Sequence, residues 1–309
     1  MRIGVDLGGT NVRAGLVKDG HIVRLLSEPC KADRPEGEVV DHIASLIGEL
    51  MQPEVSRIGI GVPSVVDAAR GIVYNVVGIP SWREVYLKDL LEKRFSVPVH
   101  VNNDCNCFAL GVCRFGEASA FSDVVCVALG TGVGGGVALG GKLLTGYTGA
   151  ASEIGHMVIA ENGEECTCGS RGCFEAYSSA TALIRDTKRT MAAHPESLLH
   201  AIAAEQGGVD GRTAFLAKER GDEAGAQVVE DYIEHLACGL TNLVNIFFPE
   251  VLALSGGVAN QGDALLLPLR ERVRERSFGS RYAVSHTRIE LCTLGYRAGV
   301  IGAAMLARE

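Results

Sequence analysis

Hydrophobic runs and turn residues predict that the chain opens with three antiparallel strands. Gly8-Gly9-Thr10 separates the first two apolar runs, and Lys18-Asp19-Gly20 separates the second from the third. Glycine-containing breaks between short apolar runs are typical of hairpin turns. The three strands are expected over Arg2 to Leu7, Asn11 to Val17 and His21 to Leu26.

The following segment is predicted to alternate helices with strands. Apolar residues at helical spacing indicate amphipathic helices, and short apolar runs that end at turn residues indicate buried strands. Helices are expected over Glu36 to Met51, over Trp82 to Phe95 and from the residues after Asp104 to about Phe115, with strands over Arg57 to Gly61 and Val97 to Val101.

The opening pattern then repeats. Two apolar runs again flank a glycine-threonine turn, and an offset of 122 residues (129 minus 7) places Leu7 on Leu129 and Gly8 on Gly130. A repeat of strand, turn and strand predicts two similar α/β halves, each of which presents a glycine-rich turn to a shared cleft. The repeated strands are expected over Val124 to Leu129 and Val133 to Leu139.

The remainder of the chain is predicted to be mainly helical, with two further strands. The helices are expected over about Ala180 to Met191, Leu198 to Ala204, Arg212 to Arg220, Glu223 to Phe248, Ala264 to Arg276 and Tyr296 to Ala307, and the strands over Val251 to Ser255 and around Arg288 to Leu291.

Composition narrows the class of protein. The 309 residues carry a net charge of −8, which argues against nucleic acid or an anionic membrane as a main partner. Ten cysteines without a secretory leader fit a reducing compartment, and no apolar run is long enough to span a membrane. We therefore expect a cytoplasmic protein. The 39 glycines cluster, as expected where backbone approaches a ligand closely.

One histidine and three cysteines lie close together in the chain. His156 precedes a polar loop, and Cys166, Cys168 and Cys173 follow within eighteen residues of it. Three thiolates and an imidazole are a ligand set for tetrahedral zinc, and four protein ligands leave no position open for chemistry. The cluster therefore predicts a structural zinc site. The alternatives are buried cysteines that pack as small hydrophobic residues, or a disulfide.

Two glycine turns are candidates for phosphate binding. Asp6 ends the first apolar strand, and Gly8, Gly9 and Thr10 could offer backbone N–H groups and a hydroxyl to a phosphate, with Asp6 holding Mg²⁺ directly or through water. A simple hairpin turn would explain the glycines but not the carboxylate. In the second turn, Thr131 and Gly132 are the predicted phosphate contacts.

Two common nucleotide motifs are excluded. The segment from Gly130 to Gly135 fits G-x-G-x-x-G, but a hairpin rather than a helix follows it, so the dinucleotide-binding interpretation fails. The chain has no G-x-x-x-x-G-K-[ST] and is not a P-loop enzyme. A third glycine turn, Gly256-Gly257, follows a buried strand, and the residues alone leave open whether it binds a ligand.

The candidate catalytic group is Asp104. It follows a predicted strand, where a carboxylate could take the proton of a hydroxyl group during phosphoryl transfer. The alternative is that Asp104 only caps the following helix.

Several of these motifs together resemble the ROK family (repressors, open reading frames and kinases), whose enzymes are mostly ATP-dependent sugar kinases. The resemblance rests on E-I-G-H at Glu153, C-T-C-G-S-R-G-C-F-E at Cys166, the Asp6-to-Thr10 turn and Asn103-Asp104-Cys105-Asn106. It implies an actin-like ATPase (ribonuclease H-like) fold of two similar α/β domains with a cleft between them. The implied domains are 1–115 with the C-terminal helix 296–309, and 116–295 with the zinc loop 153–175.

The resemblance also implies roles for individual residues. Asp104 is the expected base, and Gly256 and Gly257 lie against the adenosine. The expected sugar contacts are Ser64, Asn75, Asn103, Asp104, Glu153, His156 and Glu175. At Ser64 and Asn75 the match to the family pattern is loose.

The resemblance implies a homodimeric kinase that uses ATP, Mg²⁺ and structural zinc to phosphorylate a hexose, with glucose at its 6-hydroxyl as the first expectation. N-acetylmannosamine, allose and fructose remain open as substrates, as does a non-catalytic sugar-binding regulator. Repressors of the family carry a helix-turn-helix ahead of the first glycine turn, and only five residues precede Asp6 here, so we expect no such domain.

Overall fold

The computed structural model describes residues 1–8, 10–76, 78–283 and 285–307. The chain divides into two compact units. The first unit consists of Met1–Asp123, Gly136–Ser152 and Thr293–Glu309, and the second of Val124–Gly135 and Glu153–Cys292. This division places residues 136–152 in the first unit, whereas the sequence-based bounds placed them in the second domain. The domain bounds that the family resemblance implies, 1–115 with 296–309 and 116–295, remain a prediction.

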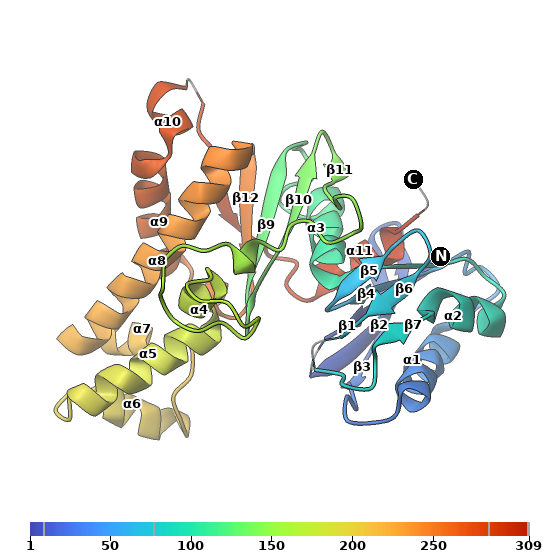
Figure 1. Cartoon of the computed structure of the whole chain (residues 1–309), viewed down its shortest axis with the longest axis horizontal. Coiled ribbons are helices and arrows are strands. Elements are labelled where there is room, and N and C mark those ends of the chain that lie inside the picture. The colour runs from blue at the N-terminus through green and yellow to red at the C-terminus, as the bar shows by residue number, and fades with distance from the viewer. Residues whose placement is uncertain (9, 77, 284, 308–309) are drawn as a thin grey trace. The chain divides into compact units, whose positions relative to one another are not determined.

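The first unit contains a five-stranded mixed sheet in the order β3-β2-β1-β4-β8 (Figure 1). Strands β1, β4 and β8 run parallel, β2 is antiparallel to β1, and β3 is antiparallel to β2. The predicted opening hairpin is confirmed, because Leu7 of β1 pairs with Val12 of β2 around the glycine turn. The strands are β1 (Arg2–Leu7), β2 (Asn11–Lys18), β3 (His21–Pro29), β4 (Ile58–Val62) and β8 (Val99–Asn103).

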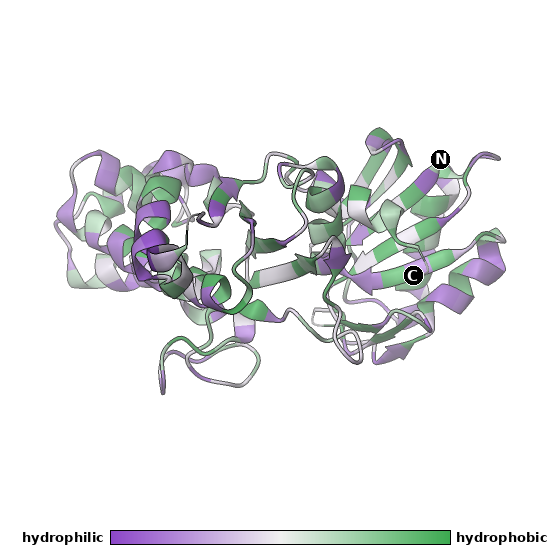
Figure 2. Ribbon diagram, turned by 90° about the horizontal axis from the view of Figure 1, so that it is seen from above, coloured by the Kyte–Doolittle hydropathy of each residue, from purple (hydrophilic) through white to green (hydrophobic). Residues whose placement is uncertain are grey.

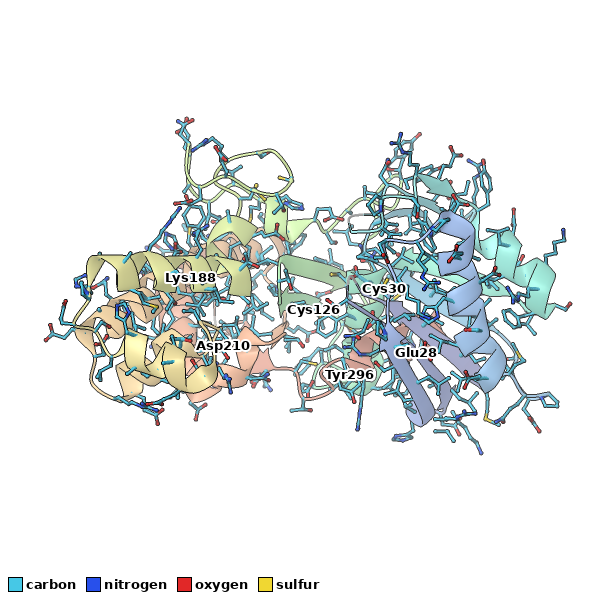
Figure 3. The ribbon with its side chains drawn as sticks, turned by 90° about the horizontal axis from the view of Figure 1, so that it is seen from below. Glu28, Cys30, Cys126, Lys188, Asp210 and Tyr296 are labelled. Atoms are coloured by element: carbon cyan, nitrogen blue, oxygen red, sulfur yellow. The ribbon has the colours of Figure 1, made fainter. Side chains whose placement is uncertain are left out.

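Helix α1 (Glu36–Leu50) packs beside this sheet through its apolar face, as its periodicity predicts. Its His42 is buried and hydrogen-bonds the Pro29 carbonyl through Nε2 at 3.1 Å. The same nitrogen lies 3.5 Å from a carboxylate oxygen of Glu28. Figure 3 labels Glu28 and Cys30 at this end of β3. His42 is therefore a structural residue that fixes α1 to β3.

Helix α11 (Arg297–Met305) packs on the same sheet, although most of the chain separates it from β1. Glycines permit the approach, because a Cβ at Gly4 would lie 1.9 Å from the Val300 carbonyl oxygen and one at Gly59 would lie 1.7 Å from that of Ala303. Helix α3 (Asp104–Phe115) lies against α11 in the same way, where a Cβ at Gly111 would lie 2.1 Å from the Ala298 carbonyl oxygen.

A small antiparallel sheet contradicts one helix prediction. Trp82 to Phe95 was expected to be helical throughout, but only α2 (Leu87–Phe95) is. The preceding residues extend along a neighbouring segment, with backbone N–H groups of Asn75 and Val76 donating to the carbonyls of Arg83 and Trp82. The short strands are β5 (Val65–Asp67), β6 (Ile72–Tyr74) and β7 (Glu84–Val85), in that order.

A second five-stranded sheet has the order β11-β10-β9-β12-β13, which repeats the order of the first. Strands β9, β12 and β13 run parallel, as β1, β4 and β8 do. The internal repeat predicted from the glycine turns is therefore confirmed at the level of sheet topology. The strands are β9 (Val124–Leu129), β10 (Val133–Leu139), β11 (Lys142–Leu143), β12 (Val251–Ser255) and β13 (Arg288–Leu291).

The second unit also contains most of the helices. They are the 3₁₀ helices η1 (Ile154–His156) and η2 (Val258–Gln261), and the α-helices α4 (Glu175–Ser178), α5 (Ala180–Ala193), α6 (Leu199–Gln206), α7 (Thr213–Glu219), α8 (Glu223–Phe247), α9 (Asp263–Arg276) and α10 (Phe278–Tyr282). Figure 2 shows hydrophobic residues concentrated along the strands and hydrophilic residues on outer helix turns. In the described part of the chain, no helix has the length and apolar character needed to cross a membrane.

Candidate active site and metal centre

Asp6 and Asp104 lie near the carboxyl ends of β1 and β8, the two parallel strands on either side of β4 in the sheet of the first unit. Asp6 of β1 is in register with Gly61 of β4, and Gly61 is in register with Asn102 of β8. Asp104 follows β8 directly as the first residue of α3. Since adjacent strands lie about 4.8 Å apart, β1 and β8 lie about 10 Å apart, and the fold places both carboxyl groups at the same end of the sheet.

Asn103, not Asp104, is the N-cap of α3. The Asn103 side-chain oxygen accepts hydrogen bonds from the backbone N–H groups of Cys105 at 2.9 Å and Asn106 at 3.1 Å. The Asn103 amide donates to the Ser64 carbonyl at 3.3 Å. The interpretation of Asp104 as a simple cap is therefore wrong, because its neighbour performs that role.

The environment of the two carboxyl groups favours their protonated forms. Burial, together with the charge of Asp104, raises the pKa of Asp6 to about 6, although the Arg13 guanidinium opposes the shift. Burial also raises the pKa of Asp104, against hydrogen bonding from the Cys105 backbone. A carboxylate whose pKa is raised towards neutrality is a stronger base than an ordinary aspartate, as proton abstraction from a hydroxyl requires.

Arg13 is a site residue that the sequence analysis missed. Its guanidinium lies 3.5 Å from a carboxylate oxygen of Asp6 and 5.1 Å from the centroid of the Tyr296 ring. Strand pairing brings it there, because Asp6 and Arg13 are direct partners in the β1–β2 hairpin. The sequence did not fix this pair, since a three-residue turn at Gly8 to Thr10 would pair Asp6 with Val12, whereas in the structure Leu7 pairs with Val12.

Gly61 is a second residue that the analysis missed. A Cβ at this position would lie 3.2 Å from the Asp104 Cα and 3.1 Å from the Cys107 Sγ. Such contacts are tighter than most side-chain packing allows, so glycine lets the start of α3 approach β4 closely. Asp104 is positioned by this approach.

The remaining predicted residues of the first unit have varied environments. The Gly8 N–H donates to the Asn11 carbonyl at 2.9 Å, and Thr10 is exposed. Gly9 lies outside the described residues. The Ser64 hydroxyl donates to the Tyr74 carbonyl. Asn75 is exposed and has a positive φ of 46°.

In the second unit, the four predicted metal ligands converge. Potential ligand atoms of His156, Cys166, Cys168 and Cys173 all lie within 4.8 Å of one another. The Cys168 and Cys173 sulfurs are 3.7 Å apart, and His156 Nδ1 is 3.7 Å from the Cys166 sulfur. A tetrahedron with Zn–S bonds of about 2.3 Å has ligand-to-ligand distances of about 3.8 Å. The donor set and its spacing therefore fit a structural zinc ion.

Two glycines with positive φ shape the metal-binding loop. Gly169 has φ 90° and Gly172 has φ 80°. A Cβ at Gly172 would lie 1.8 Å from the Ala160 carbonyl oxygen, so no other residue fits without movement of the backbone. The Gly172 carbonyl in turn accepts from the Ile159 N–H at 2.9 Å. The loop is thus folded by its own backbone hydrogen bonds.

The local environment gives the thiols of Cys168 and Cys173 different pKa values. Hydrogen bonding from the Ser170 backbone lowers the pKa of Cys168 to about 7, whereas burial raises the pKa of Cys173 to about 12. Zinc binds thiolates, so metal binding would have to release the proton of the buried thiol.

Glu175 connects the metal-binding loop to the second glycine turn. One carboxylate oxygen, Oε1, accepts from the Thr167 hydroxyl at 3.0 Å and lies 3.7 Å from the Cys166 sulfur. The other, Oε2, accepts from the Val133 N–H at 3.0 Å. A Cβ at Gly132 would lie 2.2 Å from Oε2, so glycine is needed there for the carboxylate to reach the backbone. Thr167 was not foreseen as a partner of Glu175.

The two glycine turns of the second unit differ in what their glycines do. The Gly130 carbonyl accepts from the Ala180 N–H at 2.8 Å, and Thr131 is exposed. Gly256 has φ 95°, and a Cβ there would lie 2.3 Å from the Leu129 carbonyl oxygen. No atom lies within 4 Å of a Cβ placed at Gly257. The backbone conformation and the nearby Leu129 carbonyl therefore require glycine at position 256. At Gly257 the space that a Cβ would face is open.

The structure therefore brings the predicted residues together in two groups, one in each unit. The first contains Asp6, Asn103 and Asp104 at the sheet edge, with Ser64 bonded through its carbonyl to Asn103. The second contains His156, the three cysteines and Glu175, with Gly132 against Glu175. Glu153 lies just before η1, is exposed, and accepts the His156 N–H through its carbonyl at 3.1 Å.

Comparison with known proteins gives matches over the full length of the chain. The ROK family model matches residues 2–309. The glucokinase of Thermotoga maritima is 36% identical over 312 residues, covering 99% of this chain and 97% of that protein. The crystal structure of a ROK family glucokinase from Streptomyces griseus in complex with glucose and AMPPNP is 34% identical, with a TM-score of 0.85 and 99% of both chains covered. A putative xylose repressor of Caldicellulosiruptor is 30% identical, covering 97% of this chain and 76% of the repressor.

Proposed function

The chain belongs to the ROK family, as a glucokinase-like, ATP-dependent sugar kinase, and we propose that it phosphorylates glucose at the 6-hydroxyl with Asp104 as general base. The observation that carries this proposal is the full-length similarity to glucokinases, one of which has been solved with glucose and a nucleotide analogue bound.

Asp104 has the chemistry that the proposed base requires. Phosphoryl transfer depends mainly on positioning and charge neutralisation, and a base accepts the proton of the attacking hydroxyl. The Asp104 carboxyl is held at the start of α3, and burial raises its pKa. Because Asn103 caps the helix, Asp104 is not needed as the cap. The base role is our proposal for this residue.

The nucleotide is proposed to bind through the glycine turns. Thr10 and Thr131 are exposed at their turns and offer hydroxyl donors, and Gly257 leaves open space where adenosine could lie. The other proposed contacts are Gly8, Gly9, Gly132 and Gly256. Mg²⁺, when bound, would neutralise charge on the phosphates, and Asp6 is the proposed carboxylate for it.

The proposed sugar contacts are the residues that the family resemblance assigns. The candidates are Ser64, Asn75, Asn103 and Asp104 of the first unit, and Glu153, His156 and Glu175 of the second. His156 has Nδ1 towards the Cys166 sulfur, so a zinc ion held by the cluster would leave Nε2 to hydrogen-bond a sugar oxygen. The metal would thereby orient a sugar ligand without taking part in the reaction.

The test is ATP turnover against glucose, mannose, fructose, allose, N-acetylglucosamine and N-acetylmannosamine, with Asp104→Asn as the matched variant. We expect glucose to have the highest kcat/KM and the variant to lose turnover about 10²- to 10⁴-fold while still binding glucose. A higher kcat/KM for another hexose would identify that sugar as the substrate in place of glucose. Full activity of Asp104→Asn would show that Asp104 is not the base.

A non-catalytic sugar-binding regulator is the second candidate, favoured by the similarity to a putative xylose repressor. Sugar binding by calorimetry without turnover on any sugar of the panel would support it. We also propose a homodimer, on family grounds, and light scattering coupled to gel filtration would measure it.

A further inference from the structure

A basic pocket of about 290 Å³ lies in the second unit, outside both groups of predicted residues. It is formed by the second half of α9, by α10 and by the segment that leads into β13, with α9 and α10 labelled in Figure 1. The residues that define the basic pocket here are Arg270, Arg274, His286, Arg288 and Glu290. Its volume is near the lower end of the range of about 300–1,000 Å³ for small-ligand sites.

The charge of the basic pocket is opposite to that of the chain. Three guanidinium groups face one carboxylate, in a chain whose net charge is −8. Arg270 is committed to structure, because it donates to the Ile289 carbonyl at 2.8 Å and to the Glu290 carboxylate at 2.7 Å. Arg288 also has an interaction partner in the structure, so Arg274 supplies the charge that is available to attract a small anion into the concave site.

Arg274 is the side chain best placed to bind a ligand. It lies one helical turn beyond Arg270 on α9, and within the described residues it has no hydrogen bond, ion pair or ring contact. A guanidinium binds a phosphate through two parallel N–H donors, and it loses little other bonding here when it does so.

The basic pocket is separate from the Gly256-Gly257 turn of the same unit. Strands β12 and β13 run parallel, and Arg288 is in register with Val251, the first residue of β12. The turn follows Ser255, the last residue of β12. Four residue steps at about 3.3 Å place the two ends of β12 about 13 Å apart. The Arg288 end of the basic pocket therefore lies away from the turn, although the lining reaches Glu290, which is in register with Ala253.

We propose that the basic pocket binds a phosphate dianion, either free phosphate or the phosphate group of a small monoester. The planar guanidinium of Arg274 supplies the principal contact, and Arg288 and His286 add donors from the opposite wall. The concave shape favours a small molecule over an extended polyanion.

Isothermal titration calorimetry with inorganic phosphate and with glycerol 3-phosphate tests the proposal, at constant ionic strength and with excess AMPPNP and Mg²⁺ to fill the nucleotide site. Saturable binding is expected, weakened about tenfold or more by Arg274→Ala and less by Arg274→Lys. Arg281→Ala is the matched control, because Arg281 lies on α10 outside the pocket lining and bonds the Glu275 carbonyl. That variant should bind within about twofold of the parent protein.

Equal affinity for the two ligands would identify free phosphate as sufficient, and tighter binding of glycerol 3-phosphate would identify a monoester. Absence of saturable binding, or equal loss in Arg274→Ala and Arg281→Ala, would overturn the proposal. Hydrogen exchange of the unmodified protein gives a second measurement that needs no variant. Phosphate should slow exchange in residues 270–290, and unchanged exchange there would also overturn the proposal.

Discussion

The carboxylate of Glu175 accepts a hydrogen bond from the backbone N–H of Val133 at 3.0 Å, across 42 positions of the chain. Its other oxygen accepts from the Thr167 hydroxyl in the metal-binding loop. One side chain therefore joins the metal-binding loop to the glycine turn between β9 and β10. Whatever fixes the loop also fixes one of the hydrogen bonds of that turn.

Removal of zinc is expected to abolish sugar binding and to weaken nucleotide binding only in part. Without the metal, residues 156–175 lose the bonds that hold His156 and Glu175, while the first glycine turn is unaffected. Sugar and nucleotide affinities can be measured by calorimetry on chelator-treated protein, with zinc restored as the control. Unchanged sugar affinity in the metal-free protein would refute the structural role of the ion.

Gly132→Ala is expected to destabilise the second unit by about 1–3 kcal/mol, because its Cβ would meet Glu175 Oε2 at 2.2 Å. Gly130→Ala is the matched control. Its nearest atom would be the Gly132 carbonyl oxygen at 4.0 Å, an ordinary contact, so a change of about 0.5 kcal/mol or less is expected. Denaturant unfolding of both variants measures the difference. Equal stability would show that the carboxylate moves aside without cost.

Asp6→Asn is expected to stabilise the protein at neutral pH in Mg²⁺-free buffer. A folded-state pKa raised from 3.8 to about 6 means that the folded protein binds this proton more tightly than the unfolded chain does. The resulting stability is complete below pH 4 and is lost as pH rises to about 6. At about 1.4 kcal/mol per pKa unit, the unmodified protein loses on the order of 3 kcal/mol.

The variant has no such proton, so its advantage in the free energy of unfolding should be near zero below pH 4 and should grow to its full value above pH 6. Chemical denaturation at several pH values measures this. A difference that does not change with pH would contradict the raised pKa of Asp6.

On the acid side of the pH–rate profile, activity is expected to fall at a pH above the usual pKa range of an aspartate. Asp104 must be deprotonated to act as a base, and burial raises its pKa, so kcat/KM should fall on acidification at a higher pH than an exposed carboxyl would give. Because Asp6 and Asp104 interact, the limb reports the pair. The residual activity of Asp104→Asn should lack this limb, and an unchanged profile would exclude Asp104 as its source.

Local patterns were sufficient for the elements whose residues interact with near neighbours. The opening hairpin, α1 and the repeated sheets follow from apolar runs and glycine turns, and the metal ligands lie within one short loop. The pairing of Asp6 with Arg13 could not be read from the sequence, because it depends on the register of the hairpin. A turn of only Gly8 to Thr10 would have paired Asp6 with Val12, and a slip of one residue changes every partner.

Other features depend on contacts between distant segments and could not be predicted. Residues 82–85 fit a helical pattern, but hydrogen bonds with residues 75 and 76 hold them extended. The strands β5 to β7 have only two or three residues each, which is too few to show a period. The hydrogen bond from Val133 to Glu175 exists only because the metal-binding loop folds back onto β10.

The packing of α11 on β1 and β4 has a consequence for synthesis of the protein. The backbone carbonyls of Val300 and Ala303 lie directly against Gly4 and Gly59. The sheet that contains β1 and β4 is therefore covered by a helix made from residues 297–305. At translation rates of about 5–20 residues per second, the early strands wait many seconds for this cover. The nascent first unit therefore exposes an apolar sheet face to the cell until the last helix has left the ribosome, and that interval is when chaperones would be needed.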